Sequence, residues 1–280
     1  ALIYVSVTCF GQKGPYAKKP AWDNVMQSFS GIAQSQADPE TGEPVQFYQI
    51  FVDKLTAVTA SQAITAALFA REQGTGGQHI QLAMADSVVA FLWPDVGAEA
   101  TFQEKDGMEL GTPLTRAAKP LRFADGWAQV APVSDKEFFG LYRAFGVDVG
   151  DDPRLATIES RMQNLQVVEA LFGKITAVAS EMEVETAIAR LEAEDVPCAR
   201  VMALAELPQH PQMIANGTFV ITEHPTAGKL WEPRDPARFS KTPSAVGAPA
   251  PTLGEHTDEI LREIGLASEV ELLHAENIVN

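Results

Sequence analysis

The chain of 280 residues is 46% hydrophobic and carries a formal net charge of −16 at pH 7. Length and composition together allow one or two domains with a substantial buried core. The acidic balance disfavours nucleic acid as a partner, because most of the surface would repel its phosphates. The sequence contains no run of about eighteen apolar residues, so it predicts no membrane span.

The first 93 residues alternate between strand and helix patterns. We expect a strand over 2–7, a helix that begins at or just after Asp53, and a strand-like run over 77–83 that turns helical after Met84. A glycine-rich loop is expected to end the Asp53 helix. Strand, helix and strand in this order predict a βαβ unit with a parallel sheet. We therefore assign residues 1–93 to part of a large α/β domain.

Residues 94–115 are expected to form a linker, since Gly, Pro and mixed charges replace the periodic pattern. A small α+β domain is expected over 116–205. Its signals are a two-residue hairpin turn at Asp125-Gly126, a helix with a capping box of Ser134 and Glu137, amphipathic stretches over 161–178 and 181–194, and a short buried strand within 196–204.

The last segment, residues 206–280, is rich in Pro and Gly and is expected to be mostly irregular. It contains a predicted helix near Glu255 that ends at Gly265, and a short last helix with a capping box of Ser268 and Glu271. Because a tail of this length rarely folds alone, we expect it to pack back on the large domain.

The cysteines and histidines predict neither disulfides nor a metal site. Cys9 and Cys198 lie far apart, outside any Cys-x-x-Cys motif, and are expected to be small buried hydrophobes rather than reactive thiols. The five histidines lack metal-ligand spacing. The N-terminal residues also lack the basic region of a signal peptide. The cytoplasm is therefore the expected compartment.

The N-terminal segment is locally basic in an otherwise acidic protein. Residues 1–22 contain Lys13, Lys18 and Lys19 and no acidic residue. Such a segment is suited to an anionic ligand, for example a nucleotide phosphate. A solvated loop that carries lysines is the simpler interpretation, and both stay open on the residues alone.

Asp53 lies between an apolar run and a helical pattern, where two roles fit. As a helix N-cap it would accept the amide of Leu55 or Thr56, which stabilises a helix by about 1 kcal/mol. As a nucleophile it would be kept ionised by the positive end of the helix, and nearby amides would stabilise an oxyanion. The residues permit both roles.

Six segments follow one another in a characteristic order: "LIYVSVTCFGQKGPYAKKPAWDNVMQSFSGI", "VDKLTAVTASQAITAALFAREQGTGGQHIQLAMADS", "PLRFADGW", "VPCARV", "HPQ" and "PTLGEHTDEILREIGL". Together they resemble the class III CoA-transferase family, also called the carnitine-dehydratase and bile-acid-inducible family, whose relatives include α-methylacyl-CoA racemases. The resemblance covers essentially the whole chain. It implies an α/β fold, in which the remainder of a parallel-sheet, nucleotide-binding-like large domain is joined to a small α+β domain. It also implies an interlocked homodimer.

The resemblance further implies a reaction, the transfer of CoA from an acyl-CoA to a small carboxylic acid. Asp53 in "VDKLTA" matches the nucleophile of the family, which forms an aspartyl anhydride and then an aspartyl-CoA thioester. Coenzyme A and acyl-CoA are substrates in this scheme, and no tightly bound cofactor or metal is expected. The expected partners are thus an acyl-CoA and a small acid.

The segment "KPAWD" matches the CoA-binding segment of the family. Lys19, Pro20, Ala21 and Trp22 are accordingly expected to contact CoA, with Lys19 facing phosphate or pantetheine, and Asp23 is expected to support the site. Racemase relatives carry His where this chain has Trp22. The His–Asp acid–base pair is therefore missing, and racemase or isomerase activity is the disfavoured alternative.

Relatives usually carry about a hundred further residues at the N-terminus, which supply sheet elements and CoA contacts. The chain is therefore also interpreted as a CoA-binding fragment that is inactive without that region. The donor and acceptor acids stay open in either case, because the loops that shape an acyl pocket are not located by the sequence.

Overall fold

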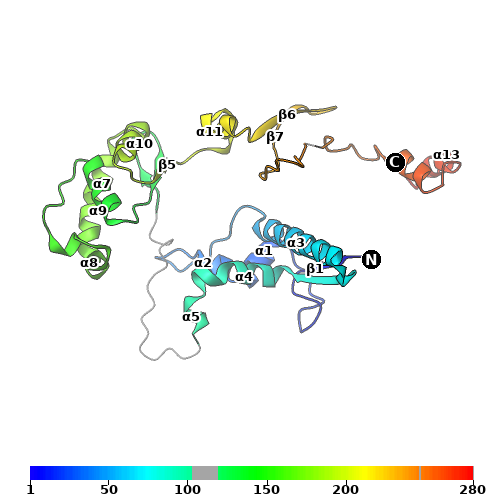
Figure 1. The fold of residues 1–280 in the computed structure, drawn as a ribbon, viewed down its shortest axis with the longest axis horizontal. Helices are drawn as coiled ribbons and strands as arrows, with labels where there is room; N and C mark the ends of the chain where they lie inside the picture. The colour runs from blue at the N-terminus through cyan, green and yellow to red at the C-terminus, as the bar shows by residue number, and fades with distance from the viewer. Residues whose placement is uncertain (103–118, 246, 280) are drawn as a thin grey trace. The chain divides into compact units, whose positions relative to one another are not determined.

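The structure is a computed structural model that describes residues 1–102, 119–245 and 247–279. The chain divides into two compact units, residues 1–119 and 120–280, whose elements are coloured in chain order in Figure 1. The mixed α/β class is confirmed, whereas the arrangement of the domains and the homodimer stay predictions. Within the described residues, no helix is long and apolar enough to cross a membrane.

The first unit is built on a parallel pair of strands joined through helices. Strands β1 (Tyr4–Thr8) and β2 (His79–Ala83) pair in register from Tyr4 with His79 to Thr8 with Ala83. The predicted βαβ unit with a parallel sheet is therefore confirmed. The helices of this unit are α1 (Asp23–Phe29), α2 (Ile32–Ser35), α3 (Phe51–Ala70), α4 (Met84–Val96) and α5 (Ala98–Thr101).

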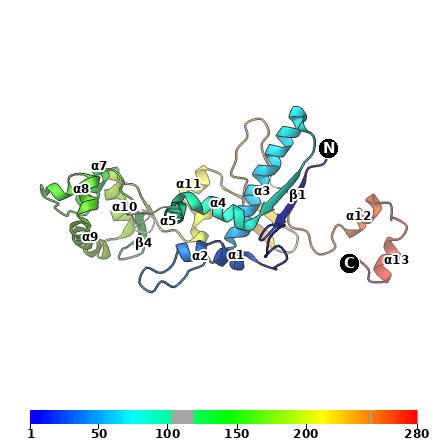
Figure 2. The same cartoon turned by 90° about the horizontal axis from the view of Figure 1, so that it is seen from below.

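Helix α3 is the long crossover between the two strands, and Figure 2 shows it alongside β1 within the first unit. Its sequence is rich in Ala and contains no Gly or Pro, which favours 20 uninterrupted helical residues. The helix begins at Phe51, two residues before the predicted start. At its other end it passes into a π-helical turn, η1 (Arg71–Thr75), in which Gly74 has a φ of 92°. Glycine adopts this angle without strain, so the predicted glycine stop is confirmed.

A small apolar core holds the first unit together. It joins residues of α1, α2, α3 and α4, namely Met26, Ile32, Val52, Met84, Ala85 and Val88. Burying a side chain of this size stabilises a fold by about 1.5–3 kcal/mol. Val52 is fully buried and directly precedes Asp53. This core therefore fixes the backbone position from which the Asp53 side chain extends into solvent.

The predicted linker over 94–115 begins too early. Pro94 lies inside α4, and α5 follows at once, so residues 94–101 are mostly helical. Proline removes only its own amide from the helix, and the Gly97 N–H still reaches the Trp93 carbonyl at 3.0 Å. Residues 103–115 of this prediction lie outside the described residues. The four-part division of the chain stays a prediction.

The second unit opens with an antiparallel sheet in the order β3-β4-β5, formed by Leu121–Arg122, Trp127–Val130 and Cys198–Arg200. Its helices are α7 (Asp135–Ala144), α8 (Ile158–Gln163), α9 (Leu165–Ser180) and α10 (Val184–Ala193), with a short helical turn η2 (Pro153–Leu155). The prediction of a buried strand within 196–204 is wrong, because β5 is the edge of the sheet and Ala199 and Arg200 are exposed.

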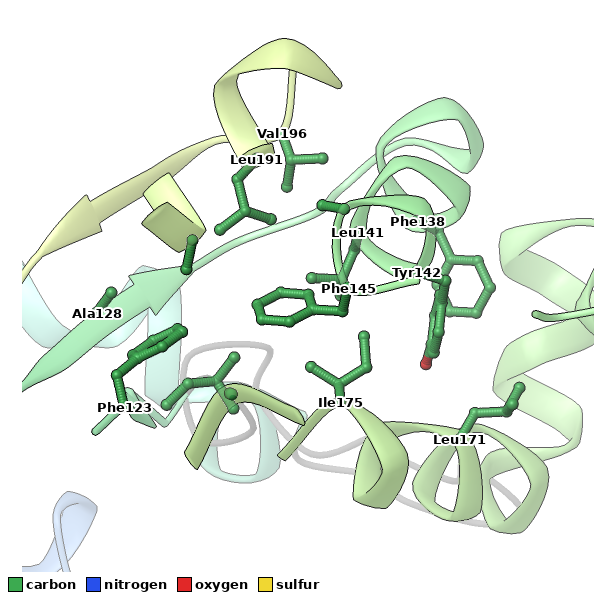
Figure 3. Packing of buried hydrophobic residues seen from close by; sticks show 14 of the residues in the cluster. Phe123, Ala128, Phe138, Leu141, Tyr142, Phe145, Leu171, Ile175, Leu191 and Val196 are labelled. Atoms are coloured by element: carbon green, nitrogen blue, oxygen red, sulfur yellow. The ribbon is translucent and has the colours of Figure 1, made fainter. Parts of the chain in front are cut away.

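The main core of the second unit joins the sheet to three of these helices. Phe123 and Ala128 belong to one cluster with Leu141 of α7, Phe145 just after α7 and Ile175 of α9, as Figure 3 shows, and α10 adds Leu191. Burial in this core raises the pKa of Tyr142 to about 12. The predicted capping box at the start of α7 is confirmed, since Ser134 and Glu137 bond each other's backbone amides.

The hairpin between β3 and β4 is confirmed, but its turn is shifted by one residue. The Phe123 N–H donates to the Gly126 carbonyl at 2.9 Å, so Ala124 and Asp125 are the central residues, and no positive φ occurs there. The carboxylate of Asp125 accepts the Val184 N–H at 2.8 Å. Asp125 therefore caps α10 instead of shaping a left-handed turn.

The C-terminal segment is more regular than predicted. It contains a short helical turn and helix followed by an antiparallel hairpin and two helices, namely η3 (Leu204–Gln209), α11 (Pro211–Ala215), β6 (Phe219–His224), β7 (Gly228–Pro233), α12 (Thr257–Glu263) and α13 (Val270–Ala275). The predicted helix end near Gly265 is confirmed. The Ser268 and Glu271 box is wrong, because Glu269 is the N-cap of α13 and Glu271 therefore stands one position too early in the helix. The predicted return of this segment to the large domain stays a prediction.

Candidate active site

Asp53 lies in the first turn of α3, where it is the third helical residue. The N-cap is Ile50, which has no side chain that could accept an amide, so the N-cap interpretation of Asp53 is wrong. The Asp53 side chain is exposed, and among the described residues its carboxylate has no hydrogen bond or ion pair. The carboxylate is therefore accessible to a ligand at the positive end of a helix.

Asp23 supplies the cap that α3 lacks. It is the first residue of α1, only 9% exposed, and its Oδ1 accepts the Asp53 N–H at 3.0 Å. In an ordinary capping box, the residue just before the helix would accept this third amide. The structure thus brings together Asp23 and Asp53, which are 30 residues apart in the chain.

Gln27 completes this arrangement, and no motif of the sequence singles it out. Its Nε2 donates to Asp23 Oδ2 at 2.6 Å, one helical turn away along α1. Both oxygens of the buried Asp23 carboxylate are therefore satisfied by N–H donors, as burial of a charged group requires. The i, i+4 spacing of Asp23 and Gln27 was visible in the sequence, but it predicts a weak surface pair unless burial is known.

The expected CoA-binding residues directly precede Asp23. Lys19 and Pro20 are exposed, and the Lys19 ammonium lies 3.5 Å from the centroid of the Tyr16 ring. The half-buried Ala21 accepts a hydrogen bond from the Cys9 thiol on its carbonyl, with a distance of 3.4 Å. Trp22 is 79% exposed at the N-cap of α1. Its indole and the Lys19 side chain are thus available at the surface next to the Asp23–Asp53 contact.

These contacts lie where the chain leaves both parallel strands. Cys9 follows β1, its thiol reaches Ala21, and its carbonyl accepts the N–H of Ala85, two residues after β2, at 3.0 Å. Ala21 lies two residues before Asp23, which holds the first turn of α3. In open α/β sheets, ligands bind outside the carboxyl ends of the strands. The Asp23–Asp53 contact therefore lies in the usual place for a ligand site.

An open hollow of about 850 Å³ lies between α1 and the segment that leads to α3. Trp22 and Asp23 line it, whereas Lys19 and Asp53 do not. Its lining includes Asp38 and Glu43 and no Lys or Arg. The hollow carries an Asp38 carboxyl whose pKa is lowered by the amides of Thr41 and Glu40. It is therefore unsuited to phosphates and better suited to a neutral part of a ligand.

Among the described residues, no group of His, Cys, Asp and Glu side chains could hold a metal ion. The site consists instead of an accessible carboxylate, a buried carboxylate that holds the first turn of its helix, and exposed Trp and Lys side chains beside them. An accessible carboxylate at a helix N-terminus can act as a covalent nucleophile or as an acid–base group.

The profile of CoA-transferase family III matches residues 1–257. The chain is 29% identical to a succinate–glutarate CoA-transferase of Agrobacterium fabrum, and the match covers 94% of this chain and 65% of that protein. It is 28% identical to a formyl-CoA:oxalate CoA-transferase of Rhodopseudomonas palustris, covering 94% of this chain and 66% of the relative. A crystal structure of a CAIB/BAIF family protein from Brucella suis superposes with a TM-score of 0.76 at 27% identity, covering 94% of this chain and 68% of that one.

The chain therefore spans slightly less than two thirds of the length of the two curated relatives. The family profile, in contrast, covers most of this chain, including Lys19 to Trp22, Asp23 and Asp53. The resemblance seen in the ordered segments of the sequence is thereby confirmed: the chain belongs to CoA-transferase family III.

Proposed function

We propose that this chain carries the nucleophile of a CoA-transferase that moves CoA from an acyl-CoA to a small carboxylic acid. Family membership and the names of the relatives, which act with succinate, glutarate, formyl-CoA and oxalate, support this class of reaction. The observation that carries the proposal is the Asp53 carboxylate. It is exposed, has no partner among the described residues, and lies in a helical turn that the buried Asp23 holds in place.

The first half of the proposed reaction transfers CoA to the protein. An oxygen of the Asp53 carboxylate attacks the thioester carbonyl, the C–S bond breaks, and CoA leaves as a thiolate, so that Asp53 and the donor acyl group form a mixed anhydride. The thiolate then attacks the Asp53 carbonyl carbon of that anhydride. The donor acid leaves as a carboxylate, and Asp53 becomes an aspartyl-CoA thioester.

The second half returns CoA to an acceptor. An incoming carboxylate attacks the aspartyl thioester, which gives a second anhydride and releases CoA thiolate. The thiolate attacks the acceptor's carbonyl carbon, forms the new thioester and restores the Asp53 carboxylate. Each step exchanges an acyl oxygen for a sulfur or the reverse, with no net proton or electron, so no redox cofactor is expected. The amides of a first helical turn are suited to stabilise the oxyanions on the way.

The CoA contacts that we propose use the segment before α1. Lys19 supplies the cation for a phosphate or for the pantetheine amides. Pro20 and Ala21 line the CoA chain between the phosphates and the thioester, and Trp22 packs on the pantetheine or acyl group. The acidic hollow beside Trp22 supports a CoA orientation in which the phosphates lie near Lys19, because the carboxylates of the hollow would repel phosphates. The cytoplasmic location and the absence of a tightly bound cofactor stay predictions.

An interlocked homodimer is also proposed, from the family resemblance. Two apolar side chains on the outer surface of α3, Val58 and Phe69, are each 68% exposed. Apolar groups with this exposure on a crossover helix favour burial against a further surface. Sedimentation of the protein at micromolar concentration tests this assembly, and a monomeric species contradicts it.

Two alternative functions are each judged by one specific observation. A racemase or isomerase would need an acid–base pair, and Trp22 stands at the position of the required His, so exchange of the acyl-CoA α-proton in deuterated water should be absent. A CoA-binding fragment without activity is motivated by the length of the chain, which spans 65% of the first relative. This second alternative predicts CoA binding without any covalent adduct.

Covalent trapping tests the main proposal. The protein is incubated with a panel of acyl-CoAs and quenched with hydroxylamine, which converts an aspartyl anhydride or thioester to a hydroxamate that peptide mass spectrometry locates. Asp86 provides a matched control, because it is also exposed and is also the third residue of a helix, α4. A hydroxamate on Asp53 and none on Asp86 is the expected result.

The other outcomes separate the alternatives. A hydroxamate on Asp86, or on a residue other than Asp53, removes Asp53 from its proposed role. No adduct together with a CoA-dependent rise of the melting temperature supports the CoA-binding fragment. No adduct and no stabilisation by millimolar CoA contradicts both interpretations.

A further inference from the structure

We propose that Gln27 is a positioning residue for the Asp53 reaction, which fixes the Asp23 carboxylate and the chain leading into α3 as one unit. The inference rests on the proposed function only for its effect on turnover, since the clamp itself is a property of the fold. Gln27 is 1% exposed, and its bonds reach either Asp23 or the segment that leads into α3. These are Nε2 to Asp23 Oδ2 at 2.6 Å, Nε2 to the carbonyls of Phe47 at 3.3 Å and Gln49 at 3.2 Å, and Oε1 from the Phe47 N–H at 2.8 Å.

The orientation of the Gln27 amide is fixed by its partners. The Phe47 N–H is a donor, so it must face Oε1, and the Asp23 carboxylate is an acceptor, so it must face Nε2. One amide hydrogen is directed to Asp23, and the other is shared between the Phe47 and Gln49 carbonyls. A flipped amide would oppose donor to donor and acceptor to acceptor.

The bonds to Phe47 and Gln49 hold the segment that enters α3. Phe47 uses both its N–H and its carbonyl on the one side chain, as a residue does with a neighbouring strand. Its ring also stacks on Phe51, the first residue of α3, with centroids 4.9 Å apart. Gln27 therefore holds the start of α3 through the segment that precedes this helix in the chain.

The bond to Asp23 holds the same helix from the other side. Asp23 accepts the Asp53 N–H, and Gln27 fills its second oxygen, so neither carboxylate oxygen is left to rotate toward another donor. The backbone of Asp53 is thus fixed between two groups that Gln27 connects. A nucleophile must be held close to its attack geometry, and a displacement of about 1 Å can cost a hundredfold in rate.

Gln46 offers a matched control on the same two elements. Its Nε2 donates to the Asn24 carbonyl at 2.9 Å and to Ser28 Oγ at 2.8 Å, so it also ties the entering segment to α1. It is exposed, and the described residues show no hydrogen bond between it and Asp23. Gln27→Leu and Gln46→Leu therefore differ in the contact to Asp23 and in burial.

We expect Gln27→Leu to lower kcat by about tenfold to a hundredfold, with KM for acyl-CoA changed by less than about threefold, because the residue does not contact CoA in this scheme. Gln46→Leu is expected to stay within about twofold of the parent protein in both constants. Melting temperatures above the assay temperature for both variants establish that folded protein is compared. Equal losses of kcat in the two variants would reduce Gln27 to one tether among several and overturn the inference.

Gln27→Glu gives a readout that simple loss of packing would not produce. The new carboxyl lies at hydrogen-bond distance from Asp23, so the two share one proton, and the pKa of the pair rises above that of an isolated carboxyl. Below that pKa the shared proton replaces the amide hydrogen toward Asp23, although the hydrogen toward the Phe47 and Gln49 carbonyls stays missing, so kcat is partly retained. Above it the two charges repel each other, and kcat falls. The variant should therefore gain kcat relative to the parent as pH is lowered from about 8 to about 5.5, whereas Gln27→Leu should follow the parent profile.

Hydrogen exchange of peptides covering 46–56 tests the clamp without any turnover. Gln27→Leu should lose protection at Phe47 and Asp53 by at least about tenfold, and Gln46→Leu should not. Unchanged protection in Gln27→Leu contradicts the clamp, whatever the activity. Lost protection in a protein whose parent form has no transferase activity leaves the clamp standing and contradicts the proposed function instead.

Discussion

The N-termini of α3 and α7 solve the same problem in different ways. At α7, Ser134 Oγ accepts the Glu137 N–H at 3.2 Å, and Glu137 Oε2 accepts the N–H groups of Ser134 and Val133 at 2.9 and 2.8 Å. At α3, the residue before the helix has no polar side chain, and the equivalent amide is bound by Asp23 from another helix. One helix start is closed within five residues, and the other requires three separate segments.

This difference separates a local stabilising element from an element that depends on tertiary structure. The α7 box lies at the surface and stabilises its helix wherever that helix is. The α3 arrangement is buried and exists only when α1, the segment 47–50 and α3 are assembled. A side chain held in this way has a defined position relative to the rest of the unit, which a reacting group needs.

The largest expected effect comes from the group that the α3 arrangement presents. Asp53→Asn keeps the shape of the side chain and removes its nucleophilic oxygen, so transfer should fall by at least about a thousandfold. The backbone N–H that bonds Asp23 is unchanged, so CoA should still raise the melting temperature. The measurement is the appearance of the new acyl-CoA by mass spectrometry.

Asp86→Asn is the control for this change, since α4 presents a carboxylate at the same helical position, and in the described part of the chain no buried carboxylate bonds its amide. We expect it to keep activity within about threefold of the parent. Comparable losses in the two variants would mean that the bond between Asp23 and the Asp53 amide does not distinguish a catalytic carboxylate from an ordinary one.

The next effect concerns stability. Asp23→Ala removes the acceptor of the Asp53 N–H and one of the three acceptors of the buried Gln27 amide, and removal of a charged hydrogen-bond partner costs about 1.5–3 kcal/mol. We expect the free energy of unfolding of the first unit to fall by about that amount in urea denaturation followed by tryptophan fluorescence. Asp38→Ala is the control, because Asp38 also accepts amides, but in an exposed turn. A loss as large in the control would indicate that burial of Asp23 adds nothing.

The same division explains what the sequence could and could not predict. The Ser134 and Glu137 box was visible because its partners are three residues apart, and the parallel pairing of β1 and β2 followed from the order of strand and helix patterns. Asp53 could be singled out, but its residues alone left cap and nucleophile open. The structure excludes the N-cap role of Asp53, because the helix starts earlier, at Phe51.

Gln27 and the exact start of α3 could not be predicted, because both depend on partners far away in the chain. Gln27 is 20 residues from Phe47, and Asp23 is 30 residues from Asp53. The hairpin of β6 and β7 was missed for a related reason. Its Pro- and Gly-rich composition predicts irregular chain, whereas the pairing of Ile221 with Trp231 gives it strand partners that no local pattern reveals.

A smaller effect is expected at the local cap. Ser134→Ala removes the acceptor for the Glu137 N–H and should lower the free energy of unfolding of the second unit by about 1 kcal/mol. Activity should be unchanged, because α7 contributes no residue to the candidate site. Ser134→Asp, which can accept the same amide, should restore most of the loss. A change in kcat in Ser134→Ala at a temperature where the protein is folded would contradict the conclusion that the start of α7 serves stability alone.

The smallest effect is the pH dependence of the same box. The backbone amides of Ser134 and Val133, in that order, lower the pKa of Glu137 below its value in the unfolded chain. The ionised carboxylate therefore contributes stability that is fully present above the unfolded pKa and is lost as pH falls through the lower folded pKa. Glu137→Gln should flatten this part of the acid-dependent loss of stability between about pH 5 and pH 3. Glu185, which lies in the first turn of α10 and has no hydrogen bond among the described residues, is the control, and Glu185→Gln should leave the urea midpoints at these pH values on the parent's curve. An identical flattening in both variants would assign the effect to overall charge rather than to the amides of the α7 box.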